Sequence, residues 1–199
     1  MSAKTKWSID STHSEISFKV AHLMMSNVKG VFRKFDASIE TEENDFTSAK
    51  IVFWINLSSL ETGDKKRDEH LKSAEFFDVK KHKKIYFVSD SFEKSGNDDC
   101  YKLCGYLTMK GHTKRIKLDV KSVGNLKDPY GNEKAGFTLN GKLSRKDWGL
   151  NWNAASDNGS IMGSDEVLIS CTLELLKSDE EELAIESVQS MNNINPNYS

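Results

Sequence analysis

The sequence predicts an all-β fold of about eight antiparallel strands, closed into a barrel or stacked as a sandwich. Apolar and polar residues alternate with a period of two through most of the chain, as they do in strands with one buried face. Turn residues separate these stretches, in "KSGNDD", "KGHT" and "KDPYGNE". The chain has 199 residues, 37% of them hydrophobic and 29% charged, which is sufficient for one globular domain with its own core.

The first expected strand, residues 15–23, places Ile16, Phe18, Val20 and His22 on one face. The same alternation predicts seven further strands, at residues 31–40, 49–57, 84–92, 101–109, 115–123, 137–145 and 166–176. Gly105 and Gly141 fall on the apolar faces of their strands. Because glycine has no side chain, we expect these two positions to leave space inside the fold.

Two stretches break the alternation. Residues 68–77, in the connection after the third strand, predict a short helix with an acidic first turn. Residues 178–199 begin with Ser178, a good N-cap, followed by a run of acids, and predict an acidic tail that is a short helix or disordered. The expected organisation is therefore one β-domain at residues 5–177 followed by this tail.

Charge and hydrophobicity indicate which partners and which cellular location to expect. The net charge of −2 indicates no nucleic-acid partner. No stretch approaches the roughly 18 apolar residues of a spanning helix, so we expect no stable membrane insertion. The first residues lack the apolar region of a signal peptide, which predicts a cytoplasmic protein, or a periplasmic one only if a leader was removed.

Metal and cofactor chemistry is not expected. Cys100, Cys104 and Cys171 are read as free thiols, since no second Cys/His pair stands at the spacing of a zinc site. The histidines are scattered over different segments. The chain also lacks a nucleophile elbow, a phosphate-binding glycine loop, a dinucleotide fingerprint and an HExxH motif. We therefore expect no catalytic residue, no metal and no cofactor.

The densest polar run, "RDEHLKSAEFFDV", has two interpretations. It is either an acid–base site, with Asp68, His70 or His22 as the titrating groups, or a latch that closes an apolar interior. The latch is favoured because no nucleophile accompanies these groups. In it, Arg67 and Asp68 bond to each other or to nearby backbone, and His70 anchors the loop. Phe76 and Phe77 cover apolar surface of the barrel.

Several longer segments resemble the YceI-like family: "WSIDSTHSEISFKVAHLM", "INLSSLETGDKKRDEHLKSAEFFDV", "GYLTMKGHTKRIKL", "AGFTLNGKLSRKDWGL" and "GSDEVLISCTLEL". The resemblance covers residues 7–175 and departs at "KKHKKIYF", where a proline usual in the family is missing. It implies an extended, lipocalin-like barrel of eight antiparallel strands. The resemblance also implies a long hydrophobic tunnel that holds an isoprenoid quinone, a polyprenyl lipid or a long acyl chain. The resemblance also implies no general enzymatic activity and makes a homodimer plausible.

The leading hypothesis is therefore non-enzymatic binding, carriage or storage of an amphiphilic lipid. Two alternatives are kept, an enzyme acting on a lipid-like substrate and an interaction module that uses Leu183, Val188 and Met191 of the tail. Most of the expected ligand contacts lie on the apolar faces of the predicted strands, and the others lie next to these faces in the sequence. They are Phe18, Val20, His22, Leu23, Met24, Phe32, Phe35, Phe53, Ile55, Phe87, Leu107, Phe137, Leu139 and Trp148.

Overall fold

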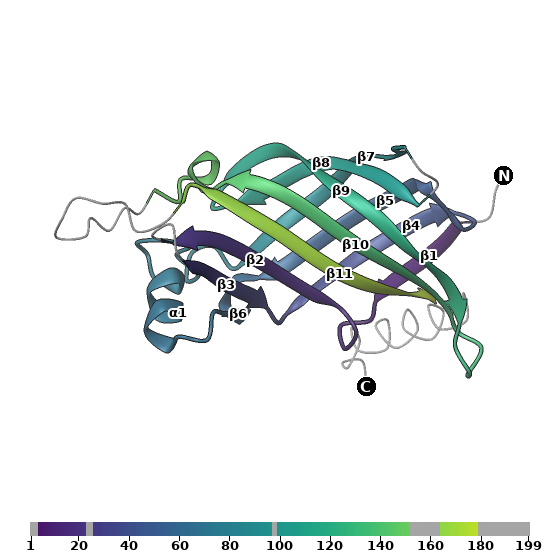
Figure 1. Cartoon of the computed structure of the whole chain (residues 1–199), viewed down its shortest axis with the longest axis horizontal. Coiled ribbons are helices and arrows are strands. Elements are labelled where there is room, and N and C mark those ends of the chain that lie inside the picture. Colours follow the sequence, from purple (N-terminus) through teal and green to yellow (C-terminus); the bar gives the residue numbers. More distant parts are fainter. Residues whose placement is uncertain (1–3, 23–25, 97–98, 152–163, 179–199) are drawn as a thin grey trace, which may run out of the picture.

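The structure, a computed structural model, describes residues 4–22, 26–96, 99–151 and 164–178. Antiparallel strands form a long barrel, and the helix α1 (Lys65–Lys72) lies at one of its ends (Figure 1). Two short 3-10 helices, η1 (Leu57–Ser59) and η2 (Arg145–Trp148), connect strands. The strands are β1 (Lys4–Ile9), β2 (Glu15–His22), β3 (Ser26–Phe32), β4 (Phe35–Glu42), β5 (Asp45–Asn56), β6 (Leu60–Glu61), β7 (Lys84–Lys94), β8 (Cys100–Met109), β9 (His112–Lys127), β10 (Glu133–Ser144) and β11 (Glu166–Ser178).

Eight of these strands close a ring in the order β1-β4-β5-β7-β8-β9-β10-β11, and β11 returns to β1. The closed ring confirms the barrel and excludes the sandwich. β11 pairs with β1 near its C-terminal end, where Lys6 faces Ser178, and with β2 near its N-terminal end, where Val20 faces Val167. β1 and β2 therefore lie end to end along β11. β3 and β6 extend the sheet from β2.

Some boundaries differ from the sequence-based prediction. β1 and β6 were not expected, and the predicted strand at residues 31–40 contains the end of β3 and the start of β4. It is interrupted because the backbone N–H groups of Arg33 and Lys34 donate to Ser59, 3.2 Å to its carbonyl oxygen and 3.0 Å to its hydroxyl, instead of continuing the ladder.

The predicted helix at residues 68–77 was misplaced by several residues. α1 begins earlier because the Asp64 carboxylate accepts hydrogen bonds from the backbone N–H groups of Lys66 and Arg67, at 3.0 and 3.1 Å. It ends at Lys72, where the backbone N–H of Ser73 donates to the carbonyl of His70. The following residues are turns rather than helix.

Aromatic side chains pack together near the far end of the barrel, which is the end opposite α1. The ring of Phe46 lies 5.0 Å from Trp7 and 4.8 Å from Phe137, measured between centroids. Phe92 lies 6.4 Å from Phe137. The buried Trp7 indole donates a 3.0 Å hydrogen bond to the Thr41 hydroxyl, so its polar atom is satisfied inside this packing. No helix in the described ranges has the length and apolar character needed to cross a bilayer.

Candidate functional site

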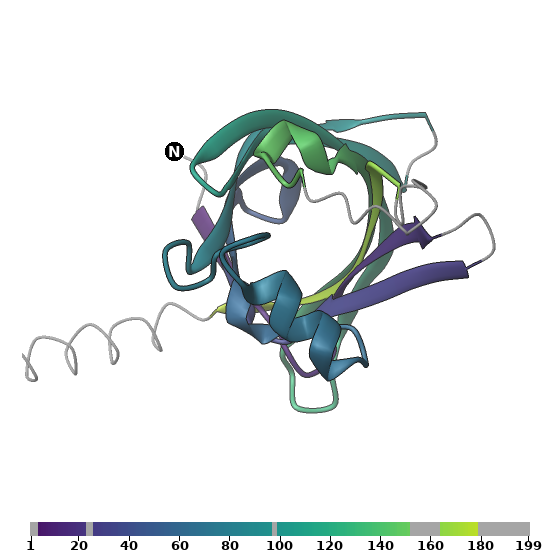
Figure 2. The ribbon, with the colours of Figure 1, turned by 90° about the vertical axis from the view of Figure 1, so that its left-hand side faces the viewer.

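The barrel encloses a cavity of about 940 Å³. Every strand of the closed ring contributes to its wall, together with β2 and β3, and most of the lining residues are aliphatic or aromatic. This volume is near the upper limit of typical ligand pockets. Figure 2 looks along the barrel from the α1 end, with α1 lying across part of the ring of strands. The period-two alternation produces this wall, because each strand turns its apolar face inward.

Polar lining residues gather at the α1 end. Thr62, Lys66, Arg67 and His70 contribute to the wall there, and Lys29 comes from β3. The far end, by contrast, is lined by Phe46, Phe92, Phe137 and other apolar residues. Among the described lining residues there is no aspartate or glutamate, so the charged lining groups are all basic. The cavity thus has an apolar interior and a polar, positively charged end.

The Arg67 and Asp68 side chains meet on Thr62. The Asp68 carboxylate accepts from the Thr62 backbone N–H at 2.9 Å and from its hydroxyl at 2.6 Å. The Arg67 guanidinium donates to the Thr62 hydroxyl at 2.8 Å and to its carbonyl at 3.0 Å. Asp68 is not on the cavity wall, whereas Arg67 is. These charge-assisted bonds tie α1 to the end of β6.

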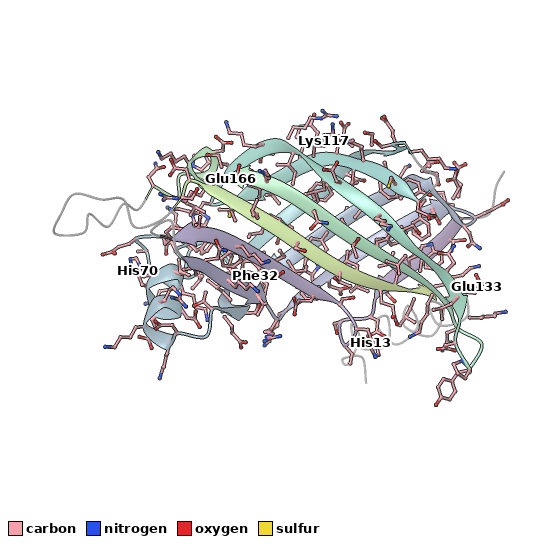
Figure 3. All side chains as sticks on the ribbon, viewed as in Figure 1. His13, Phe32, His70, Lys117, Glu133 and Glu166 are labelled. Atoms are coloured by element: carbon pink, nitrogen blue, oxygen red, sulfur yellow. The ribbon has the colours of Figure 1, made fainter. Side chains whose placement is uncertain are left out.

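His70 lies at the edge of the cavity on α1 (Figure 3). Its Nε2 is 3.0 Å from a carboxylate oxygen of Glu75, which belongs to the turn after the helix. Phe76 and Phe77 follow, with ring centroids 4.9 Å apart in an edge-to-face contact, and both line the cavity. Phe77 belongs to the buried core and Phe76 packs against that core, so these two rings fasten the segment after β6 to the end of the barrel.

The structure brings most of the predicted contact residues together. Ten of them line the cavity: Phe18, Val20, Phe32, Phe53, Ile55, Phe87, Leu107, Phe137, Leu139 and Trp148. Phe35 does not, because its buried ring packs against Phe53, 6.3 Å away, at the start of β4. Leu23, Met24 and the side chain of His22 lie outside the described residues. Contact with a ligand stays a prediction for all of them.

The sequence-based prediction missed several lining residues. Ile9 belongs to β1, the strand that was not expected. Phe92 faces inward because the register of β7 shifts between Ser89 and Ser91, which reverses the alternation. Phe46 is the second residue of β5 and precedes the alternating run that predicted this strand. The only sequence signal for the inward position of Phe92 was that this large apolar residue lies out of phase with the other apolar residues of its strand.

Arg145 and Trp148 build the wall beside η2. The Trp148 indole donates to the carbonyl of Leu107 at 3.1 Å, which fixes η2 to β8. The Arg145 guanidinium is buried, donates to the carbonyl of Leu150 at 2.7 Å and lies 2.9 Å from a carboxylate oxygen of Asp165. Arg145 therefore holds together the two sides of the connection between β10 and β11.

The Cys171 thiol lies on the cavity wall, where burial raises its pKa to about 12. It is therefore protonated at neutral pH and is a poor nucleophile. The other titratable lining groups are cations or the imidazole of His70. The described wall thus does not pair an activated nucleophile with a base, which is the arrangement that covalent catalysis needs.

One group of potential metal ligands lies outside the cavity. Side-chain atoms of Asp10, His13 and Glu174 lie within 4.8 Å of one another. The hydrogen bond from His13 lowers the pKa of the Asp10 carboxyl. The Lys134 ammonium is 2.6 Å from Glu174 and 3.7 Å from Asp10, so it already supplies the positive charge that a metal ion would bring. This group is an ion-pair network that joins β10, β11 and the turn after β1.

Comparison with known proteins decides the family. The model of the YceI-like domain matches residues 7–175. This chain belongs to the YceI-like family. A UPF0312 protein of Staphylococcus epidermidis is 37% identical over 159 residues, which cover 79% of this chain and 90% of that protein.

Solved structures agree with the YceI-like assignment. The YceI protein of Campylobacter jejuni is 31% identical and superposes with a TM-score of 0.69 over 80% of this chain and 90% of its own. A polyisoprenoid-binding domain from Saccharophagus degradans shares the fold, with a TM-score of 0.63 and 14% identity over 86% of this chain and 98% of its own. The YceI-like match covers strands from β1 to β11 and includes α1.

Proposed function

We propose that this protein binds an amphiphilic lipid, with an isoprenoid or long acyl chain inside the barrel and the head group at the α1 end. The observation that carries the proposal is the cavity of about 940 Å³, apolar toward its far end and polar at α1. Membership of the YceI-like family supports it, as does the shared fold with a domain described as polyisoprenoid-binding.

The energetics favour such a ligand. Each methylene group transferred from water to an apolar wall contributes about 0.8 kcal/mol, so a long chain needs no specific polar contact along its length. The aromatic packing of Phe46, Phe92 and Phe137 stands across the far end of the cavity. We infer that the ligand enters tail first from the α1 end and leaves its head group near Arg67 and His70.

The proposal includes carriage or storage without chemical change to the lipid. The protonated Cys171 thiol and the absence of an acid from the described wall support this part of it. If incubation with a prenyl or acyl ester gave a hydrolysis product that disappeared in His70→Ala, the protein would instead be an enzyme acting on a lipid.

Native purification followed by solvent extraction and mass spectrometry tests the proposal directly. We expect an isoprenoid or long-chain lipid in near-stoichiometric amount, and uptake of the same lipid by stripped protein. Protein that neither yields nor takes up any hydrophobic molecule would contradict the proposal.

Two neighbouring residues on β11 provide a matched pair of variants. Ile169 lines the cavity, whereas Leu168 is 40% exposed on the outer surface. Ile169→Trp should fill part of the cavity and lower the affinity for the lipid at least tenfold, while Leu168→Trp should bind as the wild type does. Equal binding by the two variants would place the ligand outside the barrel.

A further inference from the structure

Exposed lysines surround the α1 end of the barrel. Lys65 and Lys66 begin α1, and the loop that leads into β7 carries Lys80, Lys81 and Lys83. We call these five residues the lysine cluster. The loop stays next to the helix, because the backbone N–H of Val79 donates to the carbonyl of Lys72 at 3.1 Å. Both parts of the cluster therefore lie at the end where the polar lining residues gather (Figure 2).

Basic residues outnumber acidic ones around the lysine cluster: residues 64–84 contain eight lysines and arginines but five aspartates and glutamates. Most of these acids also have structural partners. Asp64 caps α1, Asp68 binds Thr62, and Glu75 contacts His70. Glu69 and Asp78 are the other two carboxylates of this segment. Within the described residues, none of the five cluster ammonium groups makes a side-chain hydrogen bond or an ion pair.

Three lysines near the far end form ion pairs instead. Lys4 lies 2.7 Å from Glu40, Lys134 lies 2.6 Å from Glu174, and Lys177 lies 2.9 Å from Glu133, which Figure 3 labels at the end opposite His70. These pairs cancel one another's charge locally. The whole chain has a net charge of −2, whereas residues 64–84 at the α1 end carry an excess of positive charge.

We propose that the α1 end is a docking surface for anionic lipid bilayers. Unpaired lysines are attracted to the negative surface potential of such a bilayer. Docking in this orientation would bring the polar end of the cavity against the lipid head groups. An apolar chain could then pass between bilayer and barrel without crossing water. This inference rests on the proposed function for its purpose, but the docking itself is independent of any bound lipid.

Vesicle binding tests the docking surface. The wild type should sediment with vesicles that contain phosphatidylglycerol, not with pure phosphatidylcholine vesicles, and added salt should weaken the binding. Each lysine near an anionic surface changes the partition coefficient by roughly fivefold, so Lys80→Gln, Lys81→Gln and Lys83→Gln together should lower it about a hundredfold.

The matched control removes the same charge from the far end. Lys94, Lys121 and Lys127 are exposed and have no ion partner among the described residues. The triple variant Lys94→Gln, Lys121→Gln and Lys127→Gln should keep vesicle binding within a fewfold of the wild type. An equal loss in both variants, or no binding of the wild type to anionic vesicles, would overturn the proposal.

Lipid uptake from detergent solution separates the two proposals. Both triple variants should load lipid from detergent as the wild type does, because neither variant alters a cavity-wall residue. Normal loading without vesicle binding would reject the docking surface and leave the proposed function standing. Vesicle binding by a protein that never loads lipid would reject the proposed function and leave the docking surface in place.

Discussion

At the residue scale, the glycines of the inner wall do not open the cavity. A Cβ atom at Gly105 would lie 2.4 Å from Cζ of Phe87 and 2.4 Å from the carbonyl oxygen of Val88. At Gly141 it would lie 2.4 Å from Cδ2 of Leu118. The expectation that these positions leave empty space was wrong, because neighbouring side chains fill it. Glycine is needed there so that bulky apolar groups can pack flat against the strand.

Gly105→Ala should therefore destabilise the protein. The new methyl group would overlap both an aromatic ring and a backbone carbonyl, and such overpacking costs about 1–3 kcal/mol. Gly136→Ala is the matched control, because its nearest neighbour would be Cβ of Val123 at 3.3 Å. Urea unfolding measures both, and an equal loss in the two variants would contradict the steric explanation.

The buried thiol of Cys171 predicts a pH dependence of stability. Its pKa is about 12 in the folded protein and 9.0 for an ordinary thiol. Above pH 9 the unfolded chain loses this proton while the folded protein keeps it, so stability falls as pH rises, by up to about 1.4 kcal/mol per pH unit. The free energy of unfolding of the wild type, relative to Cys171→Ala, should stay constant up to pH 9 and then decrease. A difference that does not change with pH would exclude this linkage.

At the scale of elements, the segment from Thr62 to Phe77 acts as a cover over one end of the barrel. Hydrogen bonds of Asp68 and Arg67 to Thr62 fix the helix to the end of β6, and Phe77, which lies in the buried core, anchors the segment to the barrel. The helix is short and has no fully buried residue, so its own propensity contributes little to its stability. The aromatic pair and the Thr62 contacts must supply the rest.

Phe77→Ala should therefore cost more than His70→Ala. Phe77 is 7% exposed, and removal of a buried phenylalanine ring costs about 3–5 kcal/mol. The contact of His70 with Glu75 is largely exposed, and such pairs contribute at most about 1 kcal/mol. Thermal unfolding and the rate of lipid release measure both variants. If His70→Ala were the more damaging change, the polar contact would be the main fastening.

Pattern in the sequence predicted the long strands well but not their interruptions. Alternation places Phe18, Phe53 and Leu139 inward, as the cavity wall shows. Alternation fails where backbone N–H groups donate outside the strand ladder, as those of Arg33 and Lys34 do to Ser59. Residues near Arg33 in the sequence give no sign of this distant contact. The cap at Asp64 was readable from the sequence, but the acidic residues inside α1 obscured it.

At the scale of the whole molecule, the barrel is asymmetric along its axis. The far end is packed with aromatic rings, whereas the α1 end carries polar residues and the lysine cluster. The sequence predicted an apolar interior, but it did not predict that polar residues gather at one end and aromatic residues at the other. That separation depends on which strand ends meet in the fold. The homodimer that the resemblance suggests stays a prediction. Ser178, which was expected to begin the tail, is instead the last residue of β11. Residues 179–199 lie outside the described residues, so the role of the tail also stays a prediction.

The aromatic packing should set the maximum chain length of the ligand. Phe46 contacts both Trp7 and Phe137, so Phe46→Ala should deepen the cavity at its far end. In a series of geraniol, farnesol and geranylgeraniol, we expect the affinity optimum to move to a longer chain. Binding competition with a fluorescent lipid measures the shift. An unchanged optimum with weaker binding throughout would show that Phe46 only stabilises the barrel.

The pairing of β11 with β1 has a consequence for how the protein is made. Ring closure joins Lys6 to Ser178, residues far apart in the sequence, and such distant contacts form late and slowly. Until β11 has left the ribosome, the other strands have no complete interior and their apolar faces stay open to water. A nascent chain therefore exposes apolar strand faces, which favour aggregation, and its cavity is complete only when the whole chain has been made.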